Sequence, residues 1–327
     1  MTARIAINGF GRIGRAAYKI ALEKPDVEIV AINDLTDPKI LAHLLKYDTA
    51  YGKFQKEITL EESTLVVGDQ RTKVFAEKDP TLLPWKDLNV DVVLECTGRF
   101  TKDDAALAHI KAGAKKVIVS APTKGGNTQT FLLGVNDDQY LGQNLISNAS
   151  CTTNCISPVA AVIHNHFKIL KSAMTTVHAI TAEQNLVDGP PPPMHPDLRR
   201  ARAAGYNMVP TTTGAAKATT EVIPELKGLF DGISIRVPII TGSLSDITML
   251  VSKKTSVDEV NQVLTEASKQ PKYANVMTVS TEPLVSSDII GTPYSAIVDA
   301  GMTKVVDGDL VKILAWYDNE WGYSNRL

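Results

Sequence analysis

Apolar and polar residues in the first half of the chain follow two periods in turn, one typical of strands and one typical of helices. Short strand-like segments alternate with segments in which apolar residues recur at helical spacing. The strand-like segments span residues 4–8, 27–33, 90–98, 115–122 and 144–150, and the helical ones span 12–22, 37–48 and 103–113. This alternation predicts a doubly wound α/β domain with a mainly parallel sheet, and residues 63–77 add an antiparallel hairpin at its side.

The pattern changes after residue 150, where strand-like segments follow one another with few helices between them. These segments span residues 172–181, 232–239, 245–252, 294–301 and 305–318. Ser256 and Glu259 form a capping box that opens a helix to about Lys269. Runs of strands favour an α+β second domain with a mainly antiparallel sheet. The boundary is expected near Ser150, and a domain junction is a place where ligand clefts form.

Composition narrows the class of protein further. With 327 residues, of which 44% are hydrophobic, the chain is long enough for two domains with substantial cores. A formal net charge of −2 gives no sign of a nucleic-acid or membrane partner, and no apolar run is long enough to span a bilayer. The three cysteines, Cys96, Cys151 and Cys155, are an odd and sparse set, which favours a reducing, cytoplasmic setting.

The turn after the first strand-like segment carries a glycine motif. Residues 9–14 give the pattern G-x-G-x-x-G between a strand and a helix, and Asp34 directly follows the next strand. Glycines there permit the close approach of a pyrophosphate to the helix N-terminus, and the aspartate can accept from a ribose hydroxyl. Turns at Thr97 and Ser120 are expected to line the same cleft. The context predicts a dinucleotide site, with a turn that merely packs helix on strand as the alternative.

Two cysteines stand four positions apart in the segment SNASCTTNCISPVAAVI, residues 147–163. A disulfide does not suit a reducing compartment, and a metal site lacks further ligands at fixed spacing, so we expect no metal. Buried packing and a reactive thiol remain as alternatives. Cys151 is expected in the first turn of a helix, where unpaired amides and the helix dipole favour a thiolate. Cys155, one turn further on, is expected to be packed and inert.

A reactive thiol also needs a base. His43 and His109 lie in helical patterns, and His195 lies in a proline-rich loop. His178 differs, because it stands near the end of the strand-like run SAMTTVHAIT and a strand would deliver it to a sheet edge. A cysteine at a helix start and a histidine at a strand end are compatible with a nucleophile and its base.

Arginines and hydroxyl residues form a third group. Arg199, Arg200 and Arg202 precede the segment PTTTGAAKAT at 210–219, and Arg236 lies within a strand. Arginine forks and hydroxyls suit a phosphate oxyanion, and a solvated basic segment before an ordinary loop is the alternative. The three groups together suit one chemistry. A thiolate adds to an aldehyde, hydride passes to a nicotinamide, and phosphate takes the acyl group from the resulting thioester.

Longer motifs carry a resemblance that runs from about residue 3 to the end of the chain. They are INGFGRIGR, SNASCTTNC, TTVHAIT, DLRRARAA, PTTTGAAKA and WYDNEWGYSN. In order and approximate spacing, the chain resembles the phosphorylating glyceraldehyde-3-phosphate dehydrogenases. The resemblance implies an NAD-binding Rossmann domain over residues 1–150, to which residues 319–327 return, and a catalytic domain over 151–318. It also implies a cytoplasmic homotetramer that converts D-glyceraldehyde 3-phosphate to 1,3-bisphosphoglycerate with NAD and inorganic phosphate, in glycolysis and gluconeogenesis.

The resemblance also assigns roles to individual residues. It implies that Cys151 is the nucleophile and that His178 activates the thiol. To the motif glycines Gly9, Gly11 and Gly14, it adds as NAD residues Phe10, Arg12, Ile13, Asp34, Lys78, Thr97, Ser120 and Asn319. Those that it assigns to phosphate are Ser150, Thr152, Thr213 and Gly214 at one subsite, Thr181 and Arg200 at the other, and Arg236 between them. Residues 180–202 correspond to a loop that reaches a neighbouring subunit's cofactor.

The chain departs from the family pattern in several places. Ala182-Glu183-Gln184 replaces the usual Asn-Asp-Gln, and prolines 190–193 lengthen the inter-subunit loop. The segment 237–246 follows a different sequence, and the chain stops at Leu327, short of the family's last helical residues. These departures bear on loop geometry and cofactor shielding more than on chemistry. An erythrose-4-phosphate dehydrogenase, an enzyme that prefers NADP, and a non-catalytic NAD-binding protein on the same fold are the alternatives.

Overall fold

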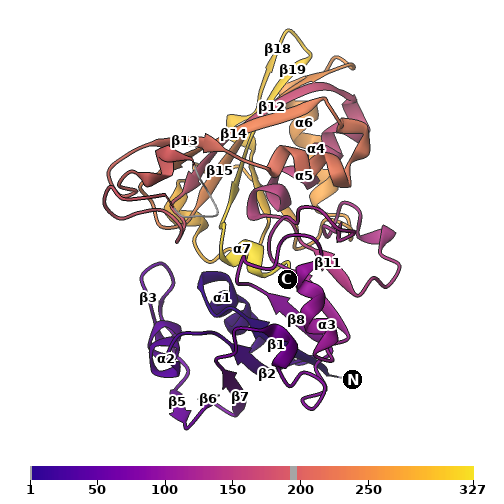
Figure 1. Ribbon diagram of the computed structural model, residues 1–327. Coiled ribbons are helices and arrows are strands. Elements are labelled where there is room, and N and C mark those ends of the chain that lie inside the picture. Colours follow the sequence, from indigo (N-terminus) through magenta and orange to yellow (C-terminus); the bar gives the residue numbers. More distant parts are fainter. Residues whose placement is uncertain (1, 192–196) are drawn as a thin grey trace. The chain divides into compact units, whose positions relative to one another are not determined.

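The computed structural model describes residues 2–191 and 197–327, which form two compact units (Figure 1). The first unit contains Met1–Phe131, Gln139–Ala149 and Ser324–Leu327, and the second contains Leu132–Asp138 and Ser150–Tyr323. The chain therefore passes between units at Ser150, where the hydrophobic pattern changes. Among the described residues, no helix combines the length and the apolar character needed to cross a membrane.

The units differ from the expected domain boundaries in two places. Residues 132–138 belong to the second unit, where Lys272 donates to a backbone carbonyl of this segment at 3.2 Å. The return to the first unit begins at Ser324, because Asn319 is bound within the second unit and accepts from the hydroxyl of Ser243 at 2.8 Å. The spacing of apolar residues does not change at either of these short segments. Only their contacts with distant residues show which unit each segment is part of.

The first unit is built on a nine-stranded sheet. Its elements are β1 Ala3–Asn8, α1 Arg12–Ala21, β2 Val27–Asn33, α2 Pro38–Lys46, β5 Ile58–Glu61, β6 Thr64–Val67, β7 Gln70–Phe75, β8 Val92–Glu95, α3 Ala108–Lys111, β9 Lys116–Val119, β10 Gln129–Thr130 and β11 Leu145–Ser147, with the separate pair β3 Tyr47–Asp48 and β4 Gly52–Lys53. The strand order is β10-β11-β9-β8-β1-β2-β7-β6-β5, and the strands from β10 to β7 are parallel. Chain order reverses between β1 and β8, which is the switch point of a doubly wound fold.

Apolar side chains fill both faces of this sheet, because successive residues of a strand point to opposite sides. Ile7 of β1 and Ile32 of β2 pack with Tyr18 of α1 and with residues of α2 on one face. Ala6 of β1 packs with Trp85 and with residues around α3 on the other face. Helical segments on both faces of a parallel sheet confirm the predicted Rossmann-type α/β architecture.

The hairpin predicted at the side of this sheet forms and extends the sheet. β6 and β7 pair antiparallel, as the alternation of apolar residues predicted. β7 also pairs in parallel with β2, with Asn33 opposite Phe75. The hairpin is thus continuous with the main sheet, because the second strand of the hairpin has a free edge that the parallel strand can use.

The second unit is built on an eight-stranded sheet. Its elements are α4 Cys151–Phe167, β12 Ile169–Ala179, β13 Val209–Thr212, α5 Ala215–Val222, β14 Phe230–Val237, β15 Ser243–Val251, α6 Val257–Ser268, β16 Met277–Ser280, β17 Ala296–Asp299, β18 Lys304–Val306, β19 Leu310–Tyr317 and α7 Trp321–Ser324. Most neighbouring strands are antiparallel, and β12 with β14 and β16 with β17 form parallel pairs. The long helix α4 packs on strands β15 and β19 and contacts α5 and α6 (Figure 1). The predicted α+β arrangement with a mainly antiparallel sheet is confirmed.

Serine residues start two of the helices in this unit. The hydroxyl of Ser150 accepts from the Thr153 amide at 3.1 Å, and that of Ser256 accepts from the Glu259 amide at 3.2 Å. Each bond satisfies one of the amides that a helix start leaves unpaired. The predicted capping box is only half formed, because the Glu259 carboxylate accepts from the hydroxyl of Thr255 at 2.8 Å.

Gly14→Ala is expected to destabilise the protein by about 2 kcal/mol. A β-carbon at Gly14 would lie 2.1 Å from the carbonyl oxygen of Gly9 and 3.1 Å from Cγ2 of Ile7, so α1 would have to move away from β1. Gly11→Ala is the matched control, because a β-carbon there meets nothing within 4 Å. Thermal denaturation of both variants measures the difference, and equal melting temperatures would contradict this account of the turn.

Candidate active site

The glycine motif forms the turn between β1 and α1. Gly9 has a φ of 93°, and a β-carbon there would lie 2.7 Å from the amide nitrogen of Thr97. α1 begins after Gly11 with no side-chain cap and no acidic residue in its first turn. Open space surrounds Gly11 where a β-carbon would stand. An uncapped helix start beside an open glycine fits the pyrophosphate of a dinucleotide.

Asp34 follows β2 and lies beside this turn. Its Oδ2 accepts from the Phe10 amide at 2.7 Å, and its Oδ1 accepts from the Thr36 amide at 2.9 Å. Each oxygen of the half-buried carboxylate has a further lone pair, so Asp34 can still accept from a ribose hydroxyl. Arg12, at the start of α1, donates to the Asp48 carboxylate at 2.6 Å, so its guanidinium is held by the protein itself.

The other cofactor residues expected in the first unit lie at the start of α1 and at strand ends. Ile13 is in the first turn of α1. Thr97 and Ser120 follow β8 and β9, which are neighbours in the sheet, and the Ser120 amide donates to the backbone carbonyl of Glu95 at 3.0 Å. Lys78 lies beyond the end of β7 and is exposed. These positions surround the carboxyl edge of the parallel strands, where doubly wound folds bind ligands.

Cys151 is the first residue of α4 and directly follows its N-cap. Ala149, two residues earlier, is buried and has a φ of 50°, a left-handed conformation that costs free energy for an alanine. Cys155 is fully buried, and its thiol donates to the backbone carbonyl of Ala315 at 3.7 Å. The two cysteines therefore occupy the different settings that the sequence pattern predicted, with only the first at the helix start.

His178 lies on β12, and its Nε2 is 3.5 Å from Sγ of Cys151. Its Nδ1 lies 2.7 Å from the backbone carbonyl oxygen of Ala179. A carbonyl oxygen can only accept, so Nδ1 carries the proton, and Nε2 of the neutral ring is an acceptor. The thiol therefore faces the ring nitrogen that can take its proton.

Burial and a nearby charge set the protonation of this pair. Burial lowers the pKa of His178 to about 3, and the positive charge of Arg236 adds to the fall. Burial also raises the pKa of the Cys151 thiol above its ordinary value, although Arg236 and hydrogen bonds from Thr152 oppose the rise. The resting pair at neutral pH is a thiol and a neutral imidazole. The helix start alone would favour the thiolate form of Cys151. Burial raises the pKa of the thiol by more than the helix amides lower it, so the thiol form is favoured instead.

Arg236 lies beside His178 because β12 and β14 pair in parallel with these two residues in register. Its Nη1 donates to the hydroxyl of Thr181 at 2.7 Å and to the carbonyl of Ala179 at 3.3 Å. The side chain is 11% exposed, and its buried Nε has no hydrogen-bond partner among the described residues. A nearly buried guanidinium with a donor to spare fits an anionic ligand.

Glu183 lies between two arginines. Its Oε1 accepts from Nη1 of Arg200 at 3.0 Å and lies 3.9 Å from Nη2 of Arg236. Burial acts to raise the pKa of Glu183, but the Thr181 hydroxyl and the two guanidiniums outweigh burial and hold that pKa below its usual value. The carboxylate therefore stays ionised and bridges both cations. Arg200 is itself buried and donates to the hydroxyl of Thr211 at 3.0 Å.

The remaining phosphate residues stand at two helix starts. Ser150 caps α4, and the hydroxyl of Thr152 lies 2.9 Å from that of Tyr317. Thr213 and Gly214 precede α5, which has no side-chain cap and no acidic residue in its first turn. Helix starts of this kind favour anions.

Tyr317 is a residue of this site that sequence analysis missed. Its hydroxyl lies 2.9 Å from that of Thr152 and 2.8 Å from that of Thr176, and its ring meets His178 edge-on with the centroids 6.0 Å apart. The tyrosine thus braces the imidazole against the start of α4. Alternation along β19 could have placed Tyr317 on the buried face, but it carries no information about these partners.

Asn319 is held by the segment that departs from the family pattern. Its Oδ1 accepts from the hydroxyl of Ser243 at 2.8 Å and from that of Thr241 at 3.2 Å. Because these donors take the oxygen, Nδ2 is the side-chain atom that can donate to a ligand. The orientation of the amide is therefore set by β15 and the turn before it.

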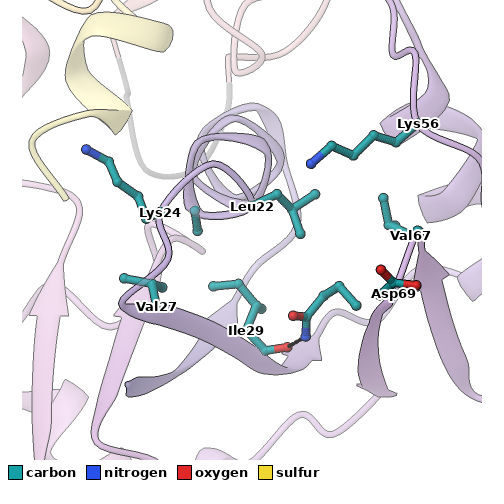
Figure 2. Close-up of a pocket in the computed structure, with 10 residues that line it drawn as sticks. Leu22, Lys24, Val27, Ile29, Lys56, Val67 and Asp69 are labelled. Carbon is teal, nitrogen blue, oxygen red and sulfur yellow. Dashed lines mark hydrogen bonds between the residues drawn. The ribbon is translucent and has the colours of Figure 1, made fainter. Parts of the chain in front are cut away.

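A cavity of about 350 Å³ in the first unit lies among other residues (Figure 2). Leu22, Ile29 and Val67 form an apolar part of its wall, and Lys56 and Asp69 are charged residues of the same lining. None of the residues assigned to the cofactor or to phosphate lines this cavity. It is therefore separate from the candidate site.

Within residues 2–191 and 197–327, no group of three or more histidine, cysteine, aspartate or glutamate side chains could hold a metal ion. The insertion of prolines 190–193 falls partly outside the described residues, which exclude Pro192 and Pro193. His195 lies outside them as well.

Comparison of the sequence with known proteins identifies the family of this chain. The sequence profile for the C-terminal domain of glyceraldehyde 3-phosphate dehydrogenase matches residues 150–319, and the profile for its NAD binding domain matches residues 3–103. A glyceraldehyde-3-phosphate dehydrogenase of Mycolicibacterium smegmatis is 52% identical over 336 aligned residues, which cover 100% of this chain and 97% of that protein. Glyceraldehyde-3-phosphate dehydrogenase 2 of Streptomyces avermitilis and the glyceraldehyde-3-phosphate dehydrogenase of Mycobacterium leprae are each 52% identical with the same coverage. The chain therefore belongs to the glyceraldehyde 3-phosphate dehydrogenase family.

Proposed function

We propose that this protein oxidises D-glyceraldehyde 3-phosphate to 1,3-bisphosphoglycerate, with NAD as hydride acceptor and inorganic phosphate as acyl acceptor. The observation that carries the proposal is the contact of Cys151 Sγ with His178 Nε2 at 3.5 Å, with Arg236 beside His178 in the sheet. A thiol, a neutral base and a nearly buried guanidinium suit acyl transfer to an oxyanion. Membership of the family supports the same activity.

Chemistry begins when Sγ of Cys151 attacks the aldehyde carbon. Nε2 of His178 takes the thiol proton as the carbon–sulfur bond forms, so a thiolate is not needed beforehand. The imidazolium then donates to the negative oxygen of the adduct. NAD bound to the first unit supplies the acceptor for the hydride that leaves the adduct carbon. The adduct oxygen becomes the carbonyl of a thioester on Cys151, and the proton stays on His178.

Phosphate completes the turnover by attacking the carbonyl of the thioester. A carbon–oxygen bond forms, the carbon–sulfur bond breaks, and the leaving thiolate recovers its proton from His178. The guanidinium of Arg236 stabilises negative charge on the sulfur, because it acts to lower the pKa of Cys151. The products are the acyl phosphate and the thiol–imidazole pair from which the cycle began.

Two groups of donors are proposed to hold the phosphates. Thr181 and Arg200 receive the phosphate of the substrate, Arg236 lies between the groups, and inorganic phosphate binds at Ser150, Thr152, Thr213 and Gly214. Glu183 already accepts from Arg200 at 3.0 Å, so a substrate phosphate competes with this carboxylate for the guanidinium. The longer side chain that replaces the usual aspartate therefore affects binding of the substrate more than the chemistry on Cys151.

We assign NAD to the carboxyl edge of the first unit's parallel strands and to Asn319. The residues proposed to contact it are Gly9, Phe10, Gly11, Arg12, Ile13, Gly14, Asp34, Lys78, Thr97, Ser120 and Asn319. A cytoplasmic homotetramer, with residues 180–202 reaching a neighbouring subunit, is the proposed working form. Size-exclusion chromatography with light scattering tests the tetramer.

Cys151→Ser is expected to abolish NAD reduction with glyceraldehyde 3-phosphate, whereas Cys155→Ala is expected to retain most of it. Only Cys151 contacts His178, and Cys155 is buried against the carbonyl of Ala315. Steady-state assays of the two purified variants measure the difference.

Iodoacetamide labelling with peptide mapping is the control for this pair of variants. Cys151 is expected to react first. Because burial raises the pKa of its thiol, its labelling rate should still be rising above about pH 8.5, the ordinary thiol value. Faster labelling of Cys96 or Cys155 would show that the nucleophile has been assigned wrongly.

The parent protein is expected to prefer NAD to NADP, and Asp34→Ala to weaken that preference about tenfold. The carboxylate can bind the ribose hydroxyls of NAD and repels the additional phosphate of NADP. Asp34→Asn is the matched variant, because it removes the charge but keeps an oxygen for the Phe10 amide, which Asp34 binds at 2.7 Å. Values of kcat/KM with both cofactors test this, and equal values in the parent protein would overturn the role of Asp34.

Steady-state NADH formation is expected to require inorganic phosphate, and Arg236→Lys is expected to raise the KM for phosphate or to lower turnover by about tenfold. A lysine cannot reproduce the planar fork that binds an oxyanion through two bonds. Assays with and without phosphate test this, with erythrose 4-phosphate as the competing substrate. Full-rate NADH formation without phosphate, with 3-phosphoglycerate as the product, would instead indicate a hydrolytic enzyme.

A further inference from the structure

A chain of buried polar side chains crosses the first unit, and the proposed chemistry uses none of them as a reacting group. Its members are Trp85, His109, Glu95, Asn8 and Asn33, and each is at most 4% exposed. Burying this much polar surface carries a cost that only complete hydrogen bonding offsets. The arrangement of the bonds shows what the chain holds in place.

The tautomer of His109 follows from its partners. Nε1 of Trp85 lies 3.0 Å from Nδ1 of His109, and an indole nitrogen can only donate. Nδ1 therefore accepts and carries no proton, so the proton of the neutral ring is on Nε2. That nitrogen lies 2.9 Å from Oε2 of Glu95 and donates to it. His109 thus accepts at one end and donates at the other.

Glu95 receives donors on both carboxylate oxygens. Oε2 accepts from His109 and also from Nδ2 of Asn8 at 2.6 Å. Oε1 accepts from the backbone amide of Thr97 at 2.8 Å and from the hydroxyl of the same residue. These donors are all neutral, and together they solvate the buried carboxylate in place of water. The direction of every bond depends on Glu95 being an acceptor at both oxygens.

The chain of bonds spans three strand ends. Asn8, Asn33 and Glu95 are the last residues of β1, β2 and β8, and Asn8 is the register partner of both of the others. Nδ2 of Asn33 donates to Oδ1 of Asn8 at 2.7 Å. The side chains therefore form one row directly beneath the turns that follow these strands.

Two of those turns touch. A β-carbon on Gly9 would lie 2.7 Å from the amide nitrogen of Thr97, which is the amide that donates to Glu95. The position of the Thr97 amide is thus fixed from below by Glu95 and from the side by the glycine turn. Any movement of Glu95 would shift the Thr97 turn against Gly9.

We propose that Glu95 and His109 are positioning residues for the cofactor, which hold the Thr97 turn against the glycine turn in the arrangement that binds NAD. This inference rests on the proposed function, because it takes the two turns to be part of the NAD site. His109 fixes Glu95, Glu95 fixes Thr97, and Trp85 fixes His109 by making it a donor toward the carboxylate. Neither Glu95 nor His109 needs to touch the cofactor.

Two substitutions of His109 separate bonding from shape. His109→Phe keeps a ring but can neither accept from Trp85 nor donate to Glu95. His109→Gln can do both, because its amide has an acceptor oxygen and a donor nitrogen. Isothermal titration of NAD into each protein is expected to give a dissociation constant at least about fivefold higher for His109→Phe and close to the parent value for His109→Gln.

Kinetics and spectroscopy add measurements that would not change if a substitution only lowered the stability of the protein. For His109→Phe, the KM for NAD is expected to rise while kcat and the KM for glyceraldehyde 3-phosphate stay near the parent values. Protein labelled with 15N-tryptophan contains three indole groups. The indole signal of Trp85, identified from Trp85→Phe, is expected to shift in His109→Phe and to be retained in His109→Gln, without any cofactor present.

Val117→Ala is the control for stability, because Val117 is fully buried on β9, next to β8, and is apolar. It should lower the melting temperature without changing the dissociation constant for NAD. Glu95→Gln provides a second variant if His109→Phe does not fold. The amide nitrogen of the glutamine would face groups that donate to the carboxylate of Glu95, so this variant should also weaken NAD binding.

The possible outcomes separate the two proposals. Parent-like NAD affinity in folded His109→Phe or Glu95→Gln, or an equal loss of affinity in Val117→Ala, would overturn the positioning role. If the parent protein bound NAD but failed to reduce it with glyceraldehyde 3-phosphate, the proposed function would fail while the positioning role would still stand.

Discussion

The pairing of β12 with β14 is the constraint on which the chemistry of the second unit rests. Their parallel register places His178 opposite Arg236, and β15 pairs along the other edge of β12. Backbone hydrogen bonds hold neighbouring strands at a fixed spacing, so the imidazole and the guanidinium cannot separate. A slip of either strand by one residue would turn its side chain to the opposite face. The sheet, rather than a loop, therefore fixes the position of the His178 imidazole relative to the Arg236 guanidinium.

This fixed relation has an electrostatic consequence. The charge of Arg236 acts to lower the pKa of His178 and to lower that of Cys151, so it favours a neutral base and a charged sulfur. Burial favours the neutral base as well but opposes the charged sulfur. The resting thiol–imidazole pair of Cys151 and His178 is therefore uncharged, beside the charged side chains of Arg236 and Glu183. Glu183 balances part of the positive charge of Arg200 and Arg236.

The regular elements could be predicted from local patterns, because the period of the apolar residues is set by each element itself. α1 was expected over 12–22 and spans Arg12–Ala21, and the helix opened by Ser256 ends at Ser268. The pairing of β7 with β2 and the place of residues 132–138 depend on partners far away in the chain, and no local period reports them. At the site, the residue types of Cys151 and His178 were visible in the sequence. Their protonation was not, because it depends on how much solvent the folded chain removes.

The two buried histidines show why such protonation needs a structure. Nδ1 of His178 donates to a backbone carbonyl at 2.7 Å, which leaves Nε2 as an acceptor facing a thiol. Nδ1 of His109 accepts from an indole at 3.0 Å, which makes Nε2 a donor facing a carboxylate. Nε2 of the same kind of side chain is thus an acceptor in one unit and a donor in the other, and the group that Nδ1 contacts determines which. A single histidine in a sequence carries no sign of that partner, since a backbone carbonyl is available everywhere and Trp85 reaches His109 only through the fold.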